Sequence, residues 1–286
     1  MNRTAAFLRY VRRNPSLAVG LMILIALAIF CAAGARLTDL RTQPYPLAAP
    51  PNKPPSIQYW FGTDAQGRNL FATIVVGTVL TLRIGLTAGA IGLGAGTILA
   101  FVAAYYRGWL DTIIRGVVDV LLTIPGLLVL VVIASANRRA VNVESMALIV
   151  ASLAWLGPTR TIRAQVLSLR ERSFVQIARL SGMSGIEIIF RELMPNLLPY
   201  LAASFVGSVT GAIFASIGLE ALGLGPLREP TLGMTIYWVL YYSALLKGMW
   251  WWVIAPIAVI VLVFVCLFLL GTGLDELANP RVRRTA

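Results

Sequence analysis

The sequence contains no histidine and few charged residues. Histidine is absent from all 286 residues, which removes the side chain that most often acts as a general base near neutral pH and as a metal ligand. Charged residues make up 13% of the chain, hydrophobic residues make up 58%, and the mean hydropathy is +0.80. A chain this apolar is not an ordinary water-soluble domain. The composition therefore predicts an integral membrane protein.

Several motifs that would indicate catalysis are also missing. Cys31 and Cys266 lie inside apolar runs near opposite ends of the chain, so no disulfide framework is predicted. A Walker A motif needs a lysine followed by serine or threonine, whereas Lys53 precedes a proline and Lys247 precedes a glycine. The acidic residues form no evident pair of catalytic carboxylates. We therefore predict that the chain is not an enzyme and has no cofactor or metal.

The positive charge is spread along the chain. The formal net charge is +12, but the basic residues are scattered between apolar runs and do not form one tail or one face. Nucleic acid is thus not a predicted partner. Anionic lipid headgroups and the orientation of the chain in the membrane account for the excess.

Long uncharged runs predict an all-α polytopic membrane helix bundle of about six transmembrane helices. The predicted spans cover residues 16–35, 84–106, 116–136, 145–156, 197–222 and 250–270. A cleavable signal sequence is the alternative for the first span, because Arg3, Arg9, Arg12 and Arg13 precede it and small residues occupy 33–35. The length of the run and the five spans that follow favour an uncleaved helix.

Three other segments are predicted to lie outside the spans. The apolar stretches 70–82 and 231–246 are too short or irregular to count as spans, so they are expected at the membrane interface or as re-entrant segments. Residues 42–55 contain six prolines and predict an extended outer loop.

The distribution of basic residues predicts the orientation. Six spans place both termini on one side of the membrane. The segments 1–15, 107–115, 158–196 and 271–286 hold roughly twice as many basic residues as the segments 36–73, 137–144 and 223–249. The positive-inside rule therefore places both termini in the cytoplasm, and a run of three tryptophans at 250–252 suits the outer aromatic belt.

Three ionisable residues are predicted at or near membrane depth: Arg83, Asp119 and Glu220. Charged groups there are costly and are expected to face the bundle interior, water or a partner. Asp119 is a candidate for a translocation path, with structural pairing as the equal alternative. For Arg83 and Glu220, near the span ends, structural pairing or snorkelling is the favoured interpretation.

The inner loop between the fourth and fifth predicted spans has a helix–break–helix pattern at residues 173–196. Two apolar faces are expected, one on each side of a break at 182–185. The first face comprises Phe174, Ile177, Ala178 and Ser181, and the second comprises Ile186, Ile189, Phe190 and Leu193. This predicts a short exposed helical hairpin that docks a partner. The alternative is an amphipathic loop lying on lipid headgroups.

This loop resembles the EAA motif of permeases in binding-protein-dependent importers: Glu-Ala-Ala, three residues, Gly, nine residues, Ile-x-Leu-Pro. Ala178, Gly182 and Pro195 agree with the motif at the correct spacing. Four residues depart from it: Gln176, Ile177, Glu192 and Met194. The resemblance implies a loop that couples the permease to its ATPase. The coupling residues that it implies are Gln176, Ala178, Arg179, Gly182, Met183, Ser184, Gly185 and Pro195.

Further blocks in the same order narrow the resemblance to the dipeptide and oligopeptide permease group, second-permease type. Residues 61–69, Phe-Gly-Thr-Asp-Ala-Gln-Gly-Arg-Asn, are similar to its FGTDxxGRD block, with Asn69 in place of the usual Asp. Similar blocks follow at 105–111, 119–125, 222–225 and 270–281. The resemblance thus covers roughly residues 60–281.

The resemblance implies a permease in the bacterial inner membrane, paired with a second permease, driven by two ATPase subunits and fed by an extracytoplasmic solute-binding protein. It divides the chain into an N-terminal helix, outer loop and FGTD block at 1–78, a permease core at 79–281 and a cytoplasmic tail at 282–286. The substrate is left open among peptides, oligosaccharides and nickel, and the segment 218–238 looks more like oligosaccharide members. The rival is a secondary transporter or channel, which would leave the hairpin loop unexplained.

Overall fold

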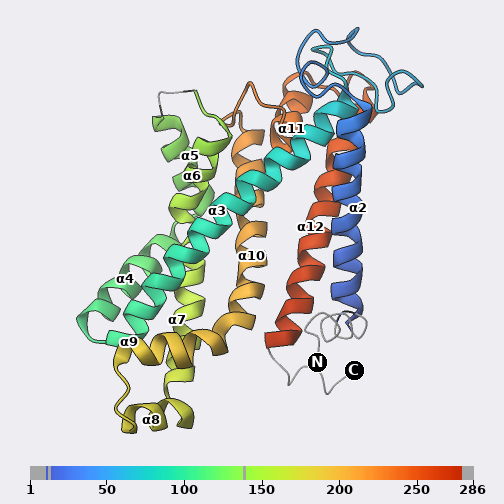
Figure 1. Ribbon diagram of the computed structural model, residues 1–286. Coiled ribbons are helices and arrows are strands. Elements are labelled where there is room, and N and C mark those ends of the chain that lie inside the picture. Colours follow the sequence, from blue (N-terminus) through green and yellow to red (C-terminus); the bar gives the residue numbers. More distant parts are fainter. Residues whose placement is uncertain (1–10, 12–13, 138–139, 279–286) are drawn as a thin grey trace.

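The computed structural model describes residue 11, residues 14–137 and residues 140–278. Those residues form a bundle of helices without a β-strand, apart from one isolated bridge between Thr63 and Asn69 (Figure 1). The predicted all-α membrane bundle is therefore confirmed. The predicted tail at 282–286 and the arginines at 3, 9, 12 and 13 lie outside the described residues.

The helices follow one another along the chain with short connections, except for the long loop 38–69. They are α2 (Pro15–Leu37), α3 (Leu70–Tyr106), α4 (Trp109–Thr123), α5 (Gly126–Ala136), α6 (Val143–Ala154), α7 (Leu156–Arg170), α8 (Ser173–Leu180), α9 (Gly185–Ile188), the π-helical turn η1 (Ile189–Leu193), α10 (Met194–Ala221), α11 (Leu232–Tyr241) and α12 (Trp250–Ala278). The loop 38–69 and α11 lie at one end of the bundle, here named the loop end (Figure 1). Helices α8 and α9 lie at the opposite end, named the hairpin end. Helix α2 begins and α12 ends toward the hairpin end.

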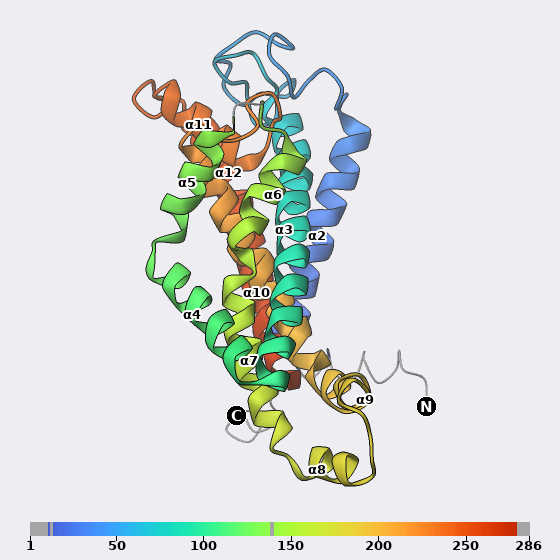
Figure 2. The same ribbon diagram turned by 90° about the vertical axis from the view of Figure 1, so that its left-hand side faces the viewer.

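Four helical stretches in the described residues are long and apolar enough to cross a membrane: α2, α3, the continuous stretch from α9 through α10, and α12. The pair α4 and α5 makes a fifth if it counts as one span. Helix α6 is too short to cross alone, but α7 follows it after one residue and the two run end to end (Figures 1 and 2). Helix α11, with 10 residues, is also too short to span.

The predicted third span, 116–136, is wrong as a single helix. Its two halves, α4 and α5, are bent by 89°. Pro125 has no N–H to donate and disfavours helical geometry at the residue before it. Ile124 accordingly adopts an extended conformation, with φ −86° and ψ 131°.

The predicted start of the second span at residue 84 is also wrong. Helix α3 begins at Leu70, so the stretch 70–82 is part of a 37-residue helix and not a separate interfacial segment. Asn69 begins the helix, because its side-chain oxygen accepts a hydrogen bond from the Phe71 N–H at 3.1 Å. At 1.5 Å per residue the helix is roughly 55 Å long, and it runs obliquely through the bundle (Figure 1). The expected boundary at residue 78 falls inside it.

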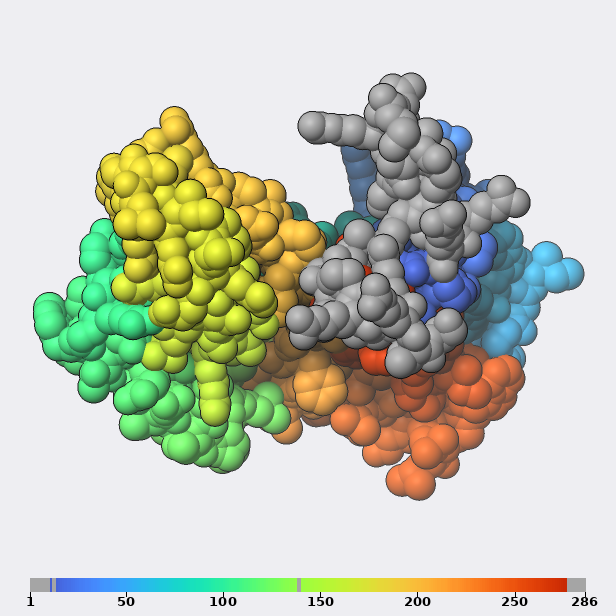
Figure 3. All heavy atoms as spheres, turned by 90° about the horizontal axis from the view of Figure 1, so that it is seen from below, coloured from blue at the N-terminus to red at the C-terminus, as the bar shows by residue number. Residues whose placement is uncertain are grey.

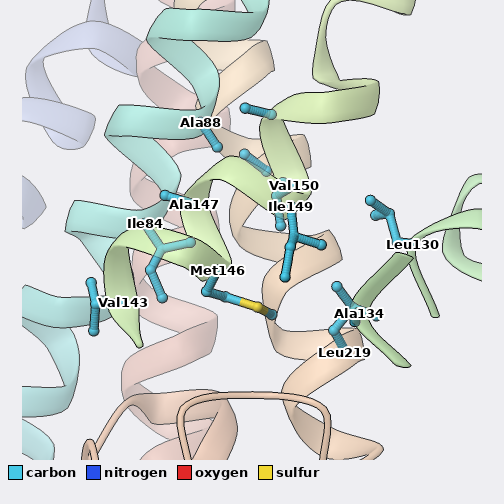
Figure 4. Packing of buried hydrophobic residues seen from close by; sticks show 12 residues of the cluster. Ile84, Ala88, Leu130, Ala134, Val143, Met146, Ala147, Ile149, Val150 and Leu219 are labelled. Carbon is cyan, nitrogen blue, oxygen red and sulfur yellow. The ribbon is translucent and has the colours of Figure 1, made fainter. Parts of the chain in front are cut away.

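Glycines allow α3 to lie close to its neighbours. A Cβ on Gly85 or Gly89 would collide with Ile213 or Val209 of α10, and a Cβ on Gly92 would collide with Ala154 of α6. Beside these contacts, buried apolar side chains of α3, α5, α6 and α10 form a core that includes Ile84, Met146 and Leu219 (Figure 4). Small residues at helix contacts are the usual means of close packing in membranes.

The FGTD block ties the long loop to α11. Asp64 Oδ1 accepts hydrogen bonds of 2.8 Å from the N–H groups of Gln66 and Arg68, and Asp64 Oδ2 lies 3.2 Å from Arg68 Nε in a buried ion pair. The Arg68 guanidinium lies 5.3 Å from the centre of the Trp238 ring in α11. Burial raises the pKa of the Asp64 carboxyl, and the Arg68 charge opposes that rise. The block thus holds the loop 38–69 against α11 at the loop end.

Replacing Asp64 with Asn should loosen the loop end. The change leaves the buried Arg68 guanidinium without its counter-charge, at a cost of about 3–5 kcal/mol. Hydrogen–deuterium exchange of the purified protein should therefore accelerate in residues 44–69 and stay unchanged in α12. The exposed Asp39→Asn variant is the matched control and should exchange like the unmodified protein. Equal exchange in both variants would show that the ion pair does not hold the loop.

Candidate functional site

The segment predicted to couple the chain to a partner forms a projecting hairpin. Helix α8 ends at Leu180, Ser181 is its C-cap residue, and Gly182 follows with φ +79°. The Gly182 N–H donates to Arg179 O at 3.0 Å and the Met183 N–H donates to Ala178 O at 3.1 Å, which is the Schellman pattern of a glycine-terminated helix. Ser184 then begins α9 by accepting a hydrogen bond from the Glu187 N–H at 3.3 Å. The predicted helix–break–helix structure is confirmed.

Only part of the two predicted apolar faces of the hairpin is buried. Val175 and Ala178 of α8 are buried together with Ile188 and Leu193, and they pack against α3 and α7. Ala178 and Leu193 belong to the predicted faces, but so do Ile177, Ile186 and Phe190, which are exposed. These three and the exposed Leu180, which the predicted faces do not include, are here named the hairpin patch. Leu180 is 88% exposed.

The reason for the difference is that the hairpin packs on one side only. The space-filling view from the hairpin end shows the yellow residues of α8 and α9 standing out from the bundle (Figure 3). Periodicity identifies apolar positions but does not say which of them find a neighbour. A cluster of exposed apolar side chains on a projecting element is typical of a protein contact surface.

Arg170 anchors the hairpin to the end of α3. Its Nη1 donates to the carbonyl oxygens of Ala104 and Tyr105 at 3.0 and 2.7 Å, and its guanidinium lies 5.6 Å from the centre of the Tyr105 ring. The last carbonyls of a helix lack intrahelical partners and favour a cation. Gly185, the first residue of α9, rests against the same Tyr105 side chain, where a Cβ would collide with the ring.

The other predicted coupling residues occupy several places on the hairpin. Gln176 and Arg179 are exposed on α8, Met183 is half-buried in the break, and Ser184 is exposed. Pro195 is exposed in the first turn of α10, which continues directly from η1. Sequence reasoning missed Arg170 and Tyr105 as anchors. Their contact joins residues 65 positions apart, which no local pattern reveals.

A second feature is a cavity of about 810 Å³ bounded mainly by α5, α6, α7 and α10. Small residues of α10 line one wall: Ser204, Gly207, Ser208, Gly211, Ala215 and Gly218. A Cβ placed on Gly207 or Gly211 would meet no atom within 4 Å, so both glycines border open space. Asp275 is the one charged residue among those that line the cavity. The recurrence of small residues every three or four positions could have revealed this wall.

Asp119 lies apart from that cavity. It is exposed on α4 and lines a separate pocket of about 180 Å³ between α4 and α7. Three arginines, Arg115, Arg160 and Arg163, line the same pocket. The prediction that Asp119 belongs to a translocation path stays a prediction.

The other two ionisable residues have structural partners. Arg83 forms an ion pair of 2.6 Å with Glu144 of α6. The fully buried Glu220 accepts hydrogen bonds from Ser216 Oγ, Thr231 Oγ1 and the Met234 N–H at 2.6, 2.5 and 3.1 Å, and so joins α10 to the start of α11. In the described part of the chain, no group of three or more Cys, Asp or Glu side chains is placed to hold a metal ion.

Residues 92–284 match the family model described as binding-protein-dependent transport system inner membrane component. The chain is 29% identical over 231 residues to the oligopeptide transport system permease protein OppC of Mycobacterium tuberculosis, and the matched region covers 81% of this chain and 79% of that protein. It is 30% identical over 276 residues to the dipeptide transport system permease protein DppC of Bacillus subtilis, covering 96% and 85%. The DppC protein of Alkalihalophilus pseudofirmus is also 30% identical, covering 96% and 89%.

Proposed function

The chain belongs to the family of binding-protein-dependent transport system inner membrane components, and we propose from this premise that it couples ATP hydrolysis in partner subunits to solute import. It is proposed to pair with a second permease subunit, to receive solute from an extracytoplasmic binding protein and to contact two ATPase subunits. The chain itself performs no catalysis in this scheme. The hairpin end faces the cytoplasm, as the distribution of basic residues predicts.

The hairpin is the observation that carries this proposal. The hairpin patch on it is exposed. The turn that joins its two helices has a positive φ at Gly182, where a residue other than glycine would be strained. The hairpin is joined to the bundle at both ends, through Arg170 to α3 and through η1 to α10. A displacement of the hairpin by a partner is therefore transmitted to two long helices.

The cavity beside α10 is the proposed solute path. One chain supplies the wall of small residues, and a second permease would close the opposite side. Hydroxyl groups of Thr161, Tyr200, Ser204 and Ser208 line it among apolar side chains, which suits solutes with amide groups as well as apolar side chains. We propose peptides as the substrate class, because the relatives above are named for oligopeptide and dipeptide transport.

Replacing Leu180 with Asp should abolish uptake without harming the fold. Leu180 is 88% exposed, so the new charge stays in water until a partner covers it, where burial of an unpaired charge is costly. The variant is expressed in a strain from which the chromosomal gene for this chain is deleted. We expect normal abundance of the variant protein and a decrease in the uptake of labelled peptide of at least tenfold. We also expect the ATPase to be lost from the complex that is purified through a tag on this chain.

The control for Leu180→Asp is Ile57→Asp, an equally exposed apolar position in the loop 38–69. It should retain the ATPase. Recovery of wild-type amounts of ATPase with Leu180→Asp would contradict the docking assignment. Uptake of a labelled oligosaccharide in place of the peptide would contradict the substrate class alone.

Replacing Gly182 with Val should also uncouple transport, for a different reason. No atom lies within 4 Å of the position of a new Cβ, so the cost of roughly 1–3 kcal/mol comes from backbone strain at φ +79° alone. We expect normal membrane insertion, with uptake lost and ATP hydrolysis either lost or no longer stimulated by solute. Pro46→Ala in the loop 38–69 is the control, and wild-type uptake by Gly182→Val would refute the prediction.

Replacing Gly211 with Phe should block the path. A Cβ at this position meets no atom within 4 Å and borders the cavity, and removal of a helical glycine does not destabilise the helix. We expect uptake to fall by at least tenfold while the ATPase stays bound. Gly94→Phe is the matched control, since Gly94 is also helical and unobstructed but does not line the cavity. Equal uptake by both variants would place the path elsewhere.

A further inference from the structure

We propose that the pocket between α4 and α7 binds phosphatidylglycerol, an anionic phospholipid, from the membrane leaflet on the hairpin side. The pocket, of about 180 Å³, has a polar lining of Arg115, Arg160, Arg163, Asp119 and Thr159. This pocket lies outside the hairpin and shares no lining residue with the large cavity.

The arginines of the pocket are not equivalent. Arg163 is committed to Asp111, whose two carboxylate oxygens accept hydrogen bonds from its Nε and Nη2 at 2.5 and 2.7 Å. Arg115 and Arg160 are exposed and form no ion pair within the described part of the chain. Two guanidinium groups are therefore available to an anion, and their planar geometry suits phosphate oxygens.

The pocket opens away from the proposed solute path. With 3.6 residues per turn, Thr159, Arg160 and Arg163 lie on the side of α7 opposite to Gly157, Pro158 and Thr161. The latter three line the large cavity and the former three line the pocket. Arg160 is exposed on this side of α7, whereas Arg163 lies between α7 and α4 in its ion pair with Asp111.

Helix α4 presents a surface for acyl chains next to these arginines. Trp109, Ile113, Val117 and Val120 form one exposed apolar stripe along it, and Trp109 is 71% exposed. The opposite side of α4 carries Arg115 and Asp119 toward α7. A helix with an apolar stripe, a charged polar face and a tryptophan at its end is typical of the membrane interface. Figure 2 shows α4 at the margin of the bundle, in the half nearer the hairpin end.

The charges favour phosphatidylglycerol over other lipids. The two uncommitted arginines and Asp119 leave one net positive charge, which one phosphate group neutralises. The hydroxyl groups of the glycerol headgroup can donate to the Asp119 carboxylate. Phosphatidylethanolamine is neutral overall, and its ammonium group would lie near two arginines. Basic pockets between helices on the cytoplasmic side are a common kind of lipid headgroup site.

The test is a binding titration on the purified full chain in a mild detergent. The probe is fluorescent phosphatidylglycerol, with phosphatidylethanolamine and phosphatidylcholine of the same acyl chains as comparisons and inorganic phosphate as a competitor. The double variant Arg115→Gln, Arg160→Gln should bind phosphatidylglycerol roughly 30-fold more weakly, which corresponds to about 2 kcal/mol at 1 kcal/mol per arginine.

Two further variants keep the test decisive. Arg36→Gln with Arg228→Gln removes two exposed arginines toward the loop end and should leave the affinity unchanged. Arg115→Lys with Arg160→Lys keeps both charges but loses the planar guanidinium geometry, so its affinity for phosphatidylglycerol should fall between those of the unmodified chain and the glutamine variant and should still exceed its affinity for phosphatidylethanolamine. The proposal is overturned if the lysine variant binds no phosphatidylglycerol, if the glutamine variant binds as tightly as the unmodified chain, or if phosphatidylethanolamine binds equally well. Full displacement by millimolar inorganic phosphate would also overturn it, because the site would then be one for a soluble anion.

Discussion

Close contact between α3 and its neighbours is the constraint on which the other features depend. Apolar side chains gain little by leaving lipid for protein, so helices in a membrane are held by close packing and by polar contacts. The glycines of α3 provide that packing against α6 and α10. Its first residue follows the FGTD block, and its last carbonyls receive Arg170. The loop end, the cavity walls and the hairpin are therefore positioned by the same helix.

The sequence was most informative where the physics is local. Gly182 was expected to break a helix, and it occupies the positive-φ position of a Schellman turn. Pro125, by contrast, was placed inside a span although its missing N–H already argued for the 89° bend. The stretch 70–82 looks too short and irregular to be a span when it is read alone, yet it forms the first part of α3. In the structure Arg83 is an ordinary helical residue whose charge is met by Glu144.

Features that depend on distant contacts could not be predicted. Arg170 and Tyr105 look like unremarkable residues until the fold brings the end of α7 beside the end of α3. The exposure of the hairpin patch could not be predicted either. The spacing of apolar residues along a helix is the same whether their side chains contact α3, a partner or solvent. The cavity could be predicted from the sequence only in part. Its small residues are visible in the sequence of α10, but spacing alone does not distinguish a tight helix contact, as at Gly85, from open space, as at Gly211.

In the proposed scheme, the hairpin acts on the solute path through the helices to which it is joined. Helix α10 continues from η1 and packs against α3 through Val209 and Ile213, so a displacement of the hairpin would reach both helices. Helix α5 lines the cavity together with α10, packs against it through the core that holds Leu130 and Leu219, and is joined to α4 through the bend at Pro125. Because α10 supplies most of the small residues of the lining, a displacement of α10 relative to α6 and α7 would change the width of the cavity.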